Sequence, residues 1–365
     1  MRVPDLVHRT GVRLASALTR RWPPRSRLFL VGEGVEWSID HDLRELDAVA
    51  RRAGIVVAPR RLLSASRDQV AFYGSQFTLL RDAWGPPRHN LATAYLHGRP
   101  GTPGYPEFDE CFRVLKAHHG ELAGVQVSHS EVEALVLESG IAPEKVVRIP
   151  IGVDTALFSP QKPPQREAAR GRLGIPLGAF VVGSFQKDGV GFAEGMEPKL
   201  IKGPDVLLAA LERLVHGVPE LHVLLTGPAR GFVRAGLERL GITYTHRLLR
   251  RYEEVATIYP ALDAYVVASR QEGGPKGVFE AMASGVPVVT TRVGQAMDLV
   301  RHGENGWVVD VEDGDGLAHW LEHVAGAPAD LPTIVASGLD TAQANSYESL
   351  FPRWFQFLSG LVDIS

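Results

Sequence analysis

The sequence predicts an α/β protein with two domains, each built on a parallel sheet. Short apolar runs alternate with longer segments of helical pattern along most of the chain, as in successive βαβ units. The length of 365 residues suits two domains of ordinary size, each with its own core. A hydrophobic content of 45% and a charged content of 22% are typical of a globular protein.

The overall charge and the cysteine count narrow the class of protein. A net charge of −3 gives no indication of a nucleic-acid partner. The single cysteine, Cys111, excludes an internal disulfide framework and favours a reducing compartment, so we expect a cytoplasmic protein. The sequence contains no apolar run of about 18 residues and no signal-peptide pattern. Arginines alternate with apolar residues over 1–21, which fits either a helix packed on the first domain or peripheral contact with an anionic membrane.

The first domain is expected over residues 1–160. Ligands of parallel sheets lie beyond the carboxyl ends of the strands, and three turns have that place: Gly32–Gly34, His97-Gly98 and 128–130. The apolar runs predict strands at Arg27–Val31, Gly54–Ala58, Leu91–Leu96, Gly124–Val127 and Lys145–Ile149, with helices at Asp42–Ala53, Phe108–His118 and Ser130–Ser139.

A second alternating series is expected over residues 166–345, followed by an aromatic-rich terminal segment over 346–365. The stretch Pro160–Gln165, rich in proline and glutamine, is the predicted linker. In the second series we expect strands at Phe180–Phe185, His222–Thr226, Ile242–His246, Ala264–Ala268 and Val286–Thr290, and helices at Pro204–Val215, Val233–Leu240 and Glu253–Tyr259.

The stretch Ser269–Pro287, between the last two of these strands, carries the clearest functional pattern. Gly273 and Gly274 precede Pro275 at the predicted first position of a helix. Glycines there let the backbone approach a ligand, and the helix N-terminus favours an anion such as a phosphate. Glu280 lies among apolar residues, where a carboxylate is costly unless sugar or ribose hydroxyls satisfy it. Lys276 and Glu280, four apart, also fit an ordinary surface ion pair.

The spacing Glu272-x7-Glu280, with Gly-Gly-Pro inside it and a strand on each side, resembles the signature of a known family. It is that of the retaining, nucleotide-sugar-dependent glycosyltransferases of family four (glycosyl transferases group 1), which have the GT-B fold. The resemblance runs from about Leu122 to Gly306. It implies two Rossmann-like domains with parallel sheets facing across a cleft, the donor held mainly by the C-terminal domain and the acceptor by the other. It also implies a terminal helix that packs back on the N-terminal domain.

The resemblance further implies roles for single residues. Glu272 contacts the hydroxyls of the donor sugar, and Glu280 binds the ribose of the nucleotide. Lys202, in a Lys-Gly pair before a helix, meets the diphosphate. His97 lines the site near the donor sugar and the acceptor. The predicted catalytic residues are Glu272, His97 and Lys202, and the predicted donor-binding residues are Glu280, Gly273, Gly274, Pro275, Lys276, Lys187, Gly32 and Gly34.

The chain departs from the family at one position. The family usually places an arginine directly after the glycine that ends the first strand of the C-terminal domain, and here that residue is Ser184. A glycine-rich insertion, Lys187–Ile201, follows. A leaving nucleoside diphosphate needs cationic stabilisation, so Lys187 and Lys202 are expected to supply it. The missing arginine leaves open a non-catalytic nucleotide-sugar-binding protein, and a sugar-nucleotide epimerase is a further alternative.

Other motifs in the sequence predict no additional cofactor. Gly189-x-Gly191-x-x-x-Gly195 looks like a dinucleotide fingerprint, but Pro198 and Pro204 interrupt the helix that a true fingerprint needs. The triplets Asp40-His41-Asp42 and Asp313-Gly314-Asp315 lie where helix N-caps are expected. The histidines and the cysteine have no zinc spacing, so no metal site is expected.

The resulting expectation is a metal-independent, retaining glycosyltransferase of the hexosyltransferase type, with a UDP- or GDP-sugar as donor. The acceptor, a saccharide, a lipid-linked molecule or a small molecule, is left open. In the mechanism that the resemblance implies, the acceptor attacks the face from which the leaving group departs. The leaving phosphate takes the acceptor's proton, so no protein base is required.

Overall fold

The computed structural model of the chain describes residues 27–34, 38–82, 89–160, 163–191 and 193–362. The contacts between residues divide the chain into two compact units. Unit 1 runs to Ile149 and also contains the segment that starts at Phe351, and unit 2 is Pro150–Leu350. The basic segment 1–21 lies outside the described residues, so its predicted membrane contact stays a prediction.

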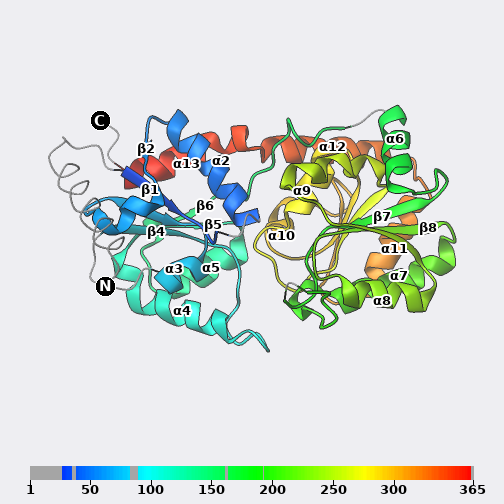
Figure 1. Cartoon of the computed structure of the whole chain (residues 1–365), viewed down its shortest axis with the longest axis horizontal. Coiled ribbons are helices and arrows are strands. Elements are labelled where there is room, and N and C mark those ends of the chain that lie inside the picture. Colours follow the sequence, from blue (N-terminus) through cyan, green and yellow to red (C-terminus); the bar gives the residue numbers. More distant parts are fainter. Residues whose placement is uncertain (1–26, 35–37, 83–88, 161–162, 192, 363–365) are drawn as a thin grey trace, which may run out of the picture. The chain divides into compact units, whose positions relative to one another are not determined.

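Unit 1 is built on a sheet of six parallel strands among the described residues, in the order β2-β1-β3-β4-β5-β6. Helices α3, α4 and α5 cover one face of this sheet, and α2 and α13 cover the other (Figure 1). The strands are β1 (Arg27–Val31), β2 (Val56–Val57), β3 (Val70–Tyr73), β4 (Asn90–Tyr95), β5 (Leu122–Val127) and β6 (Val146–Arg148). The helices are α2 (Ser38–Arg52), α3 (Gln76–Asp82), α4 (Pro106–His118), α5 (Ser130–Glu138) and α13 (Tyr347–Leu361).

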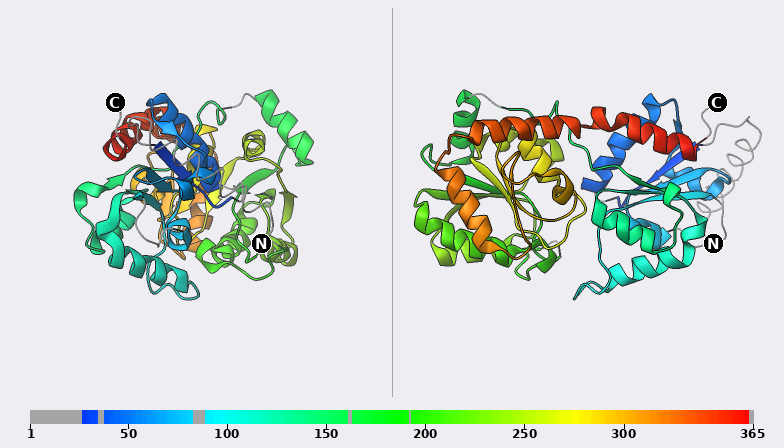
Figure 2. Two further views of the ribbon diagram at one scale, coloured as in Figure 1. Left: turned by 60° about the vertical axis from the view of Figure 1, so that its left-hand side comes forward. Right: turned by 180° about the vertical axis from the view of Figure 1, so that it is seen from behind.

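The part of the aromatic helix α13 that starts at Phe351 belongs to unit 1 and packs on this sheet (Figures 1 and 2). The rings of Trp354 and Phe357 lie 6.1 and 6.2 Å from the ring of Phe72 in β3, both edge to face. The guanidinium of Arg52, at the end of α2, lies 4.0 Å from the ring centre of Phe351. These contacts bury Phe357 and partly bury Phe351 and Trp354, while Phe355 stays exposed.

Unit 2 contains a second sheet of six parallel strands among the described residues, in the order β12-β11-β10-β7-β8-β9. The chain order reverses at β7, which has β8 on one side and β10 on the other. In open parallel sheets, ligands bind beyond the carboxyl ends of the strands at such a reversal. The strands are β7 (Phe180–Ser184), β8 (Leu221–Thr226), β9 (Thr243–Arg247), β10 (Ala264–Val267), β11 (Val288–Thr291) and β12 (Trp307–Val309).

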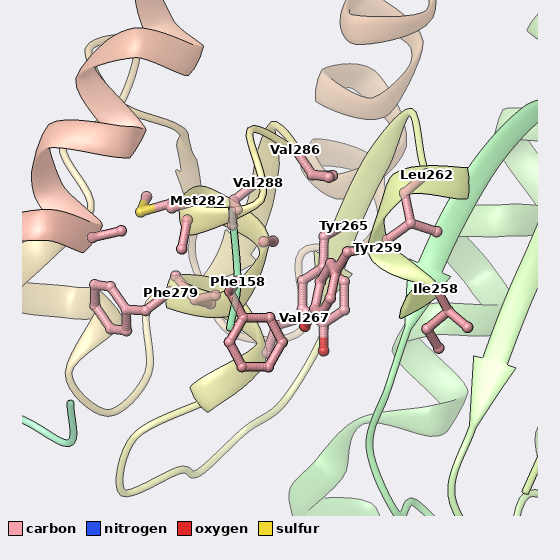
Figure 3. Close-up of a cluster of buried hydrophobic side chains, with 14 of the residues drawn as sticks. Phe158, Ile258, Tyr259, Leu262, Tyr265, Val267, Phe279, Met282, Val286 and Val288 are labelled. Carbon is pink, nitrogen blue, oxygen red and sulfur yellow. The ribbon is translucent and has the colours of Figure 1, made fainter. Parts of the chain in front are cut away.

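Helices cover both faces of the second sheet. Helices α7, α8 and α11 lie on one face, and α9 and α12 lie on the other (Figure 1). An apolar cluster fills the space between α9 and the sheet, where Figure 3 shows the rings of Tyr259 and Tyr265 side by side. The helices are α6 (Pro163–Leu173), α7 (Pro204–Gly217), α8 (Gly231–Leu240), α9 (Lys276–Ala283), α10 (Ala296–Leu299), α11 (Gly314–Ala325) and α12 (Leu331–Ala344).

The structure confirms the predicted α/β class with two parallel sheets and corrects two segments. The helix predicted at Glu253–Tyr259 is wrong: two 3₁₀ turns, η5 (Tyr252–Thr257) and η6 (Tyr259–Ala261), occupy this stretch. Pro260 lies just after the predicted segment and disfavours α-helical backbone at Tyr259, the residue before it. The predicted linker is also shorter, because residues 163–165 form the first turn of α6. Proline is tolerated there, where the N–H has no helical partner.

Among the described residues, no helix combines the length and the hydropathy that a membrane crossing requires.

Candidate functional site

Three strands of unit 2 present polar groups at the reversal point of the sheet. Gln186 follows β7, Ser269 follows β10, and Thr291 ends β11. The Thr291 hydroxyl donates to the carbonyl of Ser269 at 2.6 Å, and the Gln186 amide donates to the carbonyl of Lys202 at 2.8 Å. The hydroxyl of Ser269 lies 3.2 Å from Gln186 Oε1. These contacts hold the carboxyl ends of the strands and the Lys202 turn together.

The position of Lys202 depends on the glycine that follows it. Lys202 ends the 3₁₀ turn η4 (Leu200–Lys202), and Gly203 has a φ of +60°. A Cβ at position 203 would lie 1.9 Å from the carbonyl oxygen of Ala268, directly after β10. Only glycine fits this close approach in a left-handed conformation. The Lys-Gly pair noted in the sequence therefore brings the lysine against the end of β10.

Lys202 and Glu272 form the charged centre of this site. Lys202 Nζ lies 2.6 Å from Glu272 Oε2, and Ser269 Oγ lies 2.8 Å from Glu272 Oε1. The side chain of Glu272 is 10% exposed and that of Lys202 is 21% exposed. Both groups are therefore shielded from bulk water on most sides, which strengthens their attraction, while each keeps some exposed surface.

Glu280 is buried in α9 with 4% exposure, and two tyrosines satisfy its carboxylate. The hydroxyl of Tyr259 donates to Oε2 at 2.9 Å, and the hydroxyl of Tyr252 donates to Oε1. Burial, together with the negative charge of Glu280, raises the pKa of Tyr259 well above its ordinary value. The phenol therefore stays protonated and remains a donor. Hydrogen bonds from these two phenols thus offset the desolvation free energy of a carboxylate in this apolar helix.

The N-terminus of α9 lies one residue later than predicted. Lys276 is the first helical residue, and Pro275 is the residue before it. Gly273 lies against Gln295, whose backbone N–H donates to the Gly273 carbonyl at 3.3 Å. Lys276 Nζ donates to the hydroxyl of Tyr347 at 3.0 Å. The ammonium of Lys276 is thus held at the mouth of the helix, close to the Gly-Gly-Pro loop.

An arginine from another part of the chain lies against Ser184, the position that lacks the family's arginine. Arg230 precedes α8, and its guanidinium donates to the Ser184 carbonyl at 2.7 Å and to the Ser184 hydroxyl at 3.3 Å. A third bond reaches the carbonyl of Thr226 at the end of β8, at 2.9 Å. Arg230 Nε also lies 2.9 Å from Asp188 Oδ1, and both side chains are fully buried. The positive charge of Arg230 therefore lies beside Ser184 and is paired with the carboxylate of Asp188.

The glycine-rich insertion forms a hairpin in which residues 188–190 pair with residues 197–199. Val190 N donates to the carbonyl of Glu197 at 2.9 Å, and Lys199 N donates to that of Asp188 at 2.8 Å. Burial raises the pKa of Asp188, while Arg230 and Lys202 act in the opposite direction. Lys187, the predicted substitute for the missing arginine, is half-buried in the same loop.

The tip of this hairpin lies against α8. The carbonyls of Glu194 and Gly195 accept from the N–H groups of Gly231 and Phe232 at 2.7 and 3.0 Å. The insertion therefore caps the N-terminus of α8 with its own backbone.

The predicted site residues of unit 1 lie at carboxyl ends of its strands. Gly32 follows β1, and a Cβ there would lie 2.1 Å from Asp40 Oδ1, so the glycine admits this carboxylate; Gly34 lies in the same turn. The imidazole of His97, after β4, packs against the rings of Phe77 and Phe108, with centroids 5.6 and 5.7 Å away. The role of His97 stays a prediction.

One aspartate of each Asp-x-Asp triplet accepts a hydrogen bond from a backbone N–H. Asp313 caps α11, since its Oδ1 accepts from Gly316 N at 2.7 Å. The N-cap predicted for Asp40 is wrong, because α2 begins at Ser38; instead Asp40 Oδ1 accepts from Glu33 N at 3.0 Å. In the part of the chain that the structure describes, no group of three His, Cys, Asp or Glu side chains is placed to hold a metal ion.

Unit 2 therefore brings most of the predicted residues to one region. Around the ends of β7 and β10 and the start of α9 lie Glu272, Lys202, Gly273, Gly274, Pro275, Lys276 and Glu280, with Lys187 in the loop after β7. Sequence analysis missed Tyr252, Tyr259, Ser269 and Arg230. Ser269 and Arg230 follow strands β10 and β8, and the strand-end rule that selected His97 would have selected them. Neither Tyr252 nor Tyr259 follows a strand or belongs to a motif, so no sequence pattern pointed to them.

The family model described as glycosyl transferases group 1 matches residues 187–325. The chain is 32% identical over 300 residues to the D-inositol 3-phosphate glycosyltransferase of Corynebacterium urealyticum, covering 75% of this chain and 66% of that protein. It is 32% identical over 239 residues to D-inositol 3-phosphate glycosyltransferase 1 of Catenulispora acidiphila, covering 61% and 53%. The chain thus spans less than two thirds of the length of these relatives.

Among solved structures, Anabaena HepE in complex with UDP-glucose matches with a TM-score of 0.74 at 20% identity, covering 93% of this chain and 100% of that one. The sucrose-phosphate synthase of Thermosynechococcus elongatus matches with a TM-score of 0.71 at 18% identity, covering 92% and 99%. At such identities the likeness concerns the fold.

Proposed function

The chain belongs to the glycosyl transferases group 1 family and has the GT-B fold, and on that premise we propose that it transfers a sugar from a nucleoside-diphosphate sugar to an acceptor hydroxyl. The observation that carries the proposal is the contact of Lys202 with Glu272 at 2.6 Å, at the reversal point of the second sheet. A carboxylate that accepts from hydroxyls and an ammonium that meets phosphate are the two groups a sugar diphosphate requires.

The proposed division of labour follows the position of each group. Glu272 accepts hydrogen bonds from the hydroxyls of the donor sugar. Lys202 has three N–H donors, so it can keep its bond to Glu272 and still bind a phosphate oxygen. The N-terminus of α9, with Lys276 as its first residue, binds the diphosphate. Glu280 recognises the ribose of the nucleotide.

We propose a retaining, metal-independent reaction. The acceptor hydroxyl forms the new bond to the anomeric carbon on the face from which the diphosphate departs, and a phosphate oxygen takes the proton of that hydroxyl. The leaving diphosphate gains negative charge as its bond to the sugar breaks. Lys202 and Lys276 are the proposed source of the fixed positive charge that stabilises it. The proposal is supported by their contacts with Glu272 and Tyr347 around the start of α9.

The names of the relatives guide the choice of acceptor. Because they are named for D-inositol 3-phosphate, a polyol phosphate is the acceptor class to test first. The UDP-glucose in the HepE complex supports UDP-sugars as the first donors.

The test is a transfer assay with the purified chain. UDP-glucose, UDP-N-acetylglucosamine and GDP-mannose are each supplied with inositol 3-phosphate or without acceptor, in excess chelator. We expect acceptor-dependent release of nucleoside diphosphate and a product that keeps the donor's anomeric configuration by NMR. Loss of turnover in chelator that magnesium or manganese restores would contradict metal independence, and an inverted product would contradict retention. Donor binding with neither transfer nor hydrolysis for any donor would favour a non-catalytic binding protein.

A further inference from the structure

The hydroxyl of Tyr252 donates to Oε1 of Glu280, the carboxylate proposed to recognise ribose. We propose that Tyr252 is an internal competitor of the nucleotide: its phenol takes the place of a ribose hydroxyl in the free protein and leaves when the nucleotide binds. This inference rests on the proposed function, in which Glu280 recognises ribose. It adds a residue that sets the affinity for the nucleotide.

The hydrogen bond from Tyr252 to Glu280 is chemically equivalent to the one that a ribose hydroxyl would form in its place. The Tyr252 hydroxyl donates one hydrogen bond to Glu280 Oε1. A ribose hydroxyl binding a carboxylate does the same, with one O–H donor and one charged oxygen acceptor. A carboxylate oxygen can accept more than one hydrogen bond, but Glu280 is only 4% exposed and Tyr259 already donates to Oε2. A ribose hydroxyl that takes the position of the phenol at Oε1 therefore displaces the Tyr252 bond.

The two tyrosines on Glu280 differ in their freedom to move. Tyr259 is 0% exposed, and its ring packs against Phe158, Phe185 and Tyr265 at centroid distances of 5.6, 5.0 and 5.7 Å. Figure 3 shows it inside the apolar cluster beside Tyr265. Tyr252 is half-buried and is the first residue of the short turn η5, directly after the exposed Arg251. Tyr252 is therefore the partner that can leave, and Tyr259 the partner that keeps Glu280 in place.

Lys276 couples this movement to the diphosphate. Its ammonium lies 5.1 Å from the ring centre of Tyr252 and donates to the hydroxyl of Tyr347. A cation at that distance stabilises the ring in its present position. A phosphate at the N-terminus of α9 attracts the same ammonium, which weakens the contact that holds Tyr252. The diphosphate and the ribose of one nucleotide thus act on Tyr252 from two sides.

The inference has a measurable consequence for affinity. When only a fraction of the molecules is in the binding-competent state, the apparent dissociation constant equals the intrinsic one divided by that fraction. Tyr252→Phe removes the hydroxyl and keeps the ring beside Lys276 and Phe158. We therefore expect Tyr252→Phe to bind nucleotide about threefold to tenfold more tightly, the ratio that corresponds to one intramolecular hydrogen bond. A residue that only supports the fold would not increase affinity when it is truncated.

The experiment is calorimetric titration of UDP, GDP and ADP into the wild-type chain, followed by titration of the tightest binder into the variants. The matched control is Tyr244→Phe, since Tyr244 also donates to a carboxylate, Glu238 Oε1 at 2.6 Å, in the β9 region. Tyr244→Phe is expected to leave the affinity unchanged, and Tyr259→Phe to weaken it. The 2′,3′-dideoxy form of the same nucleotide cannot compete for Glu280, so Tyr252→Phe is expected to give no gain with it. Thermal unfolding of each variant checks that it folds.

The outcomes separate this inference from the proposed function. If none of the three nucleotides binds, or if Glu280→Gln binds as the wild type does, the assignment of Glu280 to ribose fails and this inference fails with it. If Glu280→Gln weakens binding but Tyr252→Phe does not bind more tightly, only the competitor role is overturned, and weaker binding by Tyr252→Phe would mean that Tyr252 orients Glu280. An equal gain with the dideoxy nucleotide would also overturn it.

Discussion

The ammonium of Lys202 lies 2.6 Å from the carboxylate of Glu272, although 70 residues separate the two in the chain. Two backbone turns make this contact possible. Gly203 lets the Lys202 turn approach the end of β10, and the loop after Ser269 turns Glu272 back toward it. The pair is therefore a product of the sheet's topology, and it marks the part of the candidate site to which the proposed function assigns the sugar and the phosphate.

Glu272→Gln is expected to separate nucleotide binding from sugar transfer. The amide keeps the shape of the side chain but loses the charge that orders the sugar hydroxyls. We expect nearly unchanged affinity for the nucleoside diphosphate and a transfer rate lowered about 10²-fold or more, the scale of one lost electrostatic contact in an active site. Calorimetry and a transfer assay on one preparation measure both quantities. Parallel loss of binding and transfer would show that Glu272 also serves the nucleotide.

Glu280→Gln is expected to weaken nucleotide binding in a chain that stays folded. The loss is about 10-fold to 100-fold, because a hydrogen bond to a charged acceptor contributes about 1.5–3 kcal/mol. The amide offers its oxygen to one of Tyr252 and Tyr259 and an N–H to the hydroxyl oxygen of the other, so both phenols keep a partner. Titration and thermal unfolding test the two statements. Normal affinity in the folded variant would remove Glu280 from the nucleotide site.

Gly203→Ala is expected to destabilise the chain and abolish transfer together. Its matched control is Gly241→Ala, since Gly241 has a φ of +67° with no atom within 4 Å of an added Cβ. Both substitutions carry the left-handed penalty of about 1–2 kcal/mol. Only Gly203→Ala adds a clash, with Ala268 O at 1.9 Å. Urea denaturation should give a clearly larger loss in unfolding free energy for Gly203→Ala; equal losses would mean that the Lys202 turn can shift freely.

Asp205→Asn is expected to show a pH-dependent loss of stability. Arg270, next to Ser269, binds Asp205 through two bonds of 2.8 Å and Glu312 through one of 2.8 Å. The hydrogen bonds from Arg270 hold the pKa of Asp205 below its ordinary value of 3.8. Because the folded state favours the ionised form, the stabilisation is complete above that value and is lost as the pH falls through the lower folded pKa.

The expected difference between wild type and Asp205→Asn is about 0.5–1 kcal/mol at pH 7, since the pair is partly exposed and screened. Urea denaturation at pH 7, 5, 4 and 3 should show the difference shrinking only below pH 4. Asp205 also lies in the first turn of α7, so a double-mutant cycle with Arg270→Gln isolates the pair from the helix-end effect. A difference that is constant down to pH 3 would contradict the role given to ionisation.

Much of the fold could be predicted from the sequence because buried parallel strands appear as apolar runs. The run at Phe180–Ser184 was predicted within one residue. Strand β3 was missed, although its four buried residues form an apolar run as short as that of β10, which was predicted. The segment Glu253–Tyr259 was predicted as a helix ending before Pro260, whereas the structure has two 3₁₀ turns over this stretch.

The candidate site could be predicted where a local pattern carries it. Glu272 and Glu280 were found from their spacing, and Lys202 from the glycine beside it. The partners of these residues could not be found in the same way. Tyr252 and Tyr259 lie 28 and 21 residues from Glu280, and Arg230 lies 46 residues from Ser184, so each contact exists only after the sheet has formed.

The buried pair of Asp188 and Arg230 also has an evolutionary consequence. A lone charge at either position would be enclosed without a partner, which is far more costly than replacing both. The guanidinium also rests on the small side chain of Ser184, which leaves no room for an arginine there. Among relatives, positions 184, 188 and 230 should therefore change as a set: lineages with arginine at 184 should lack the charges at both other positions. The hairpin that carries Asp188 would then occur in the same relatives that have Arg230 and a serine at position 184.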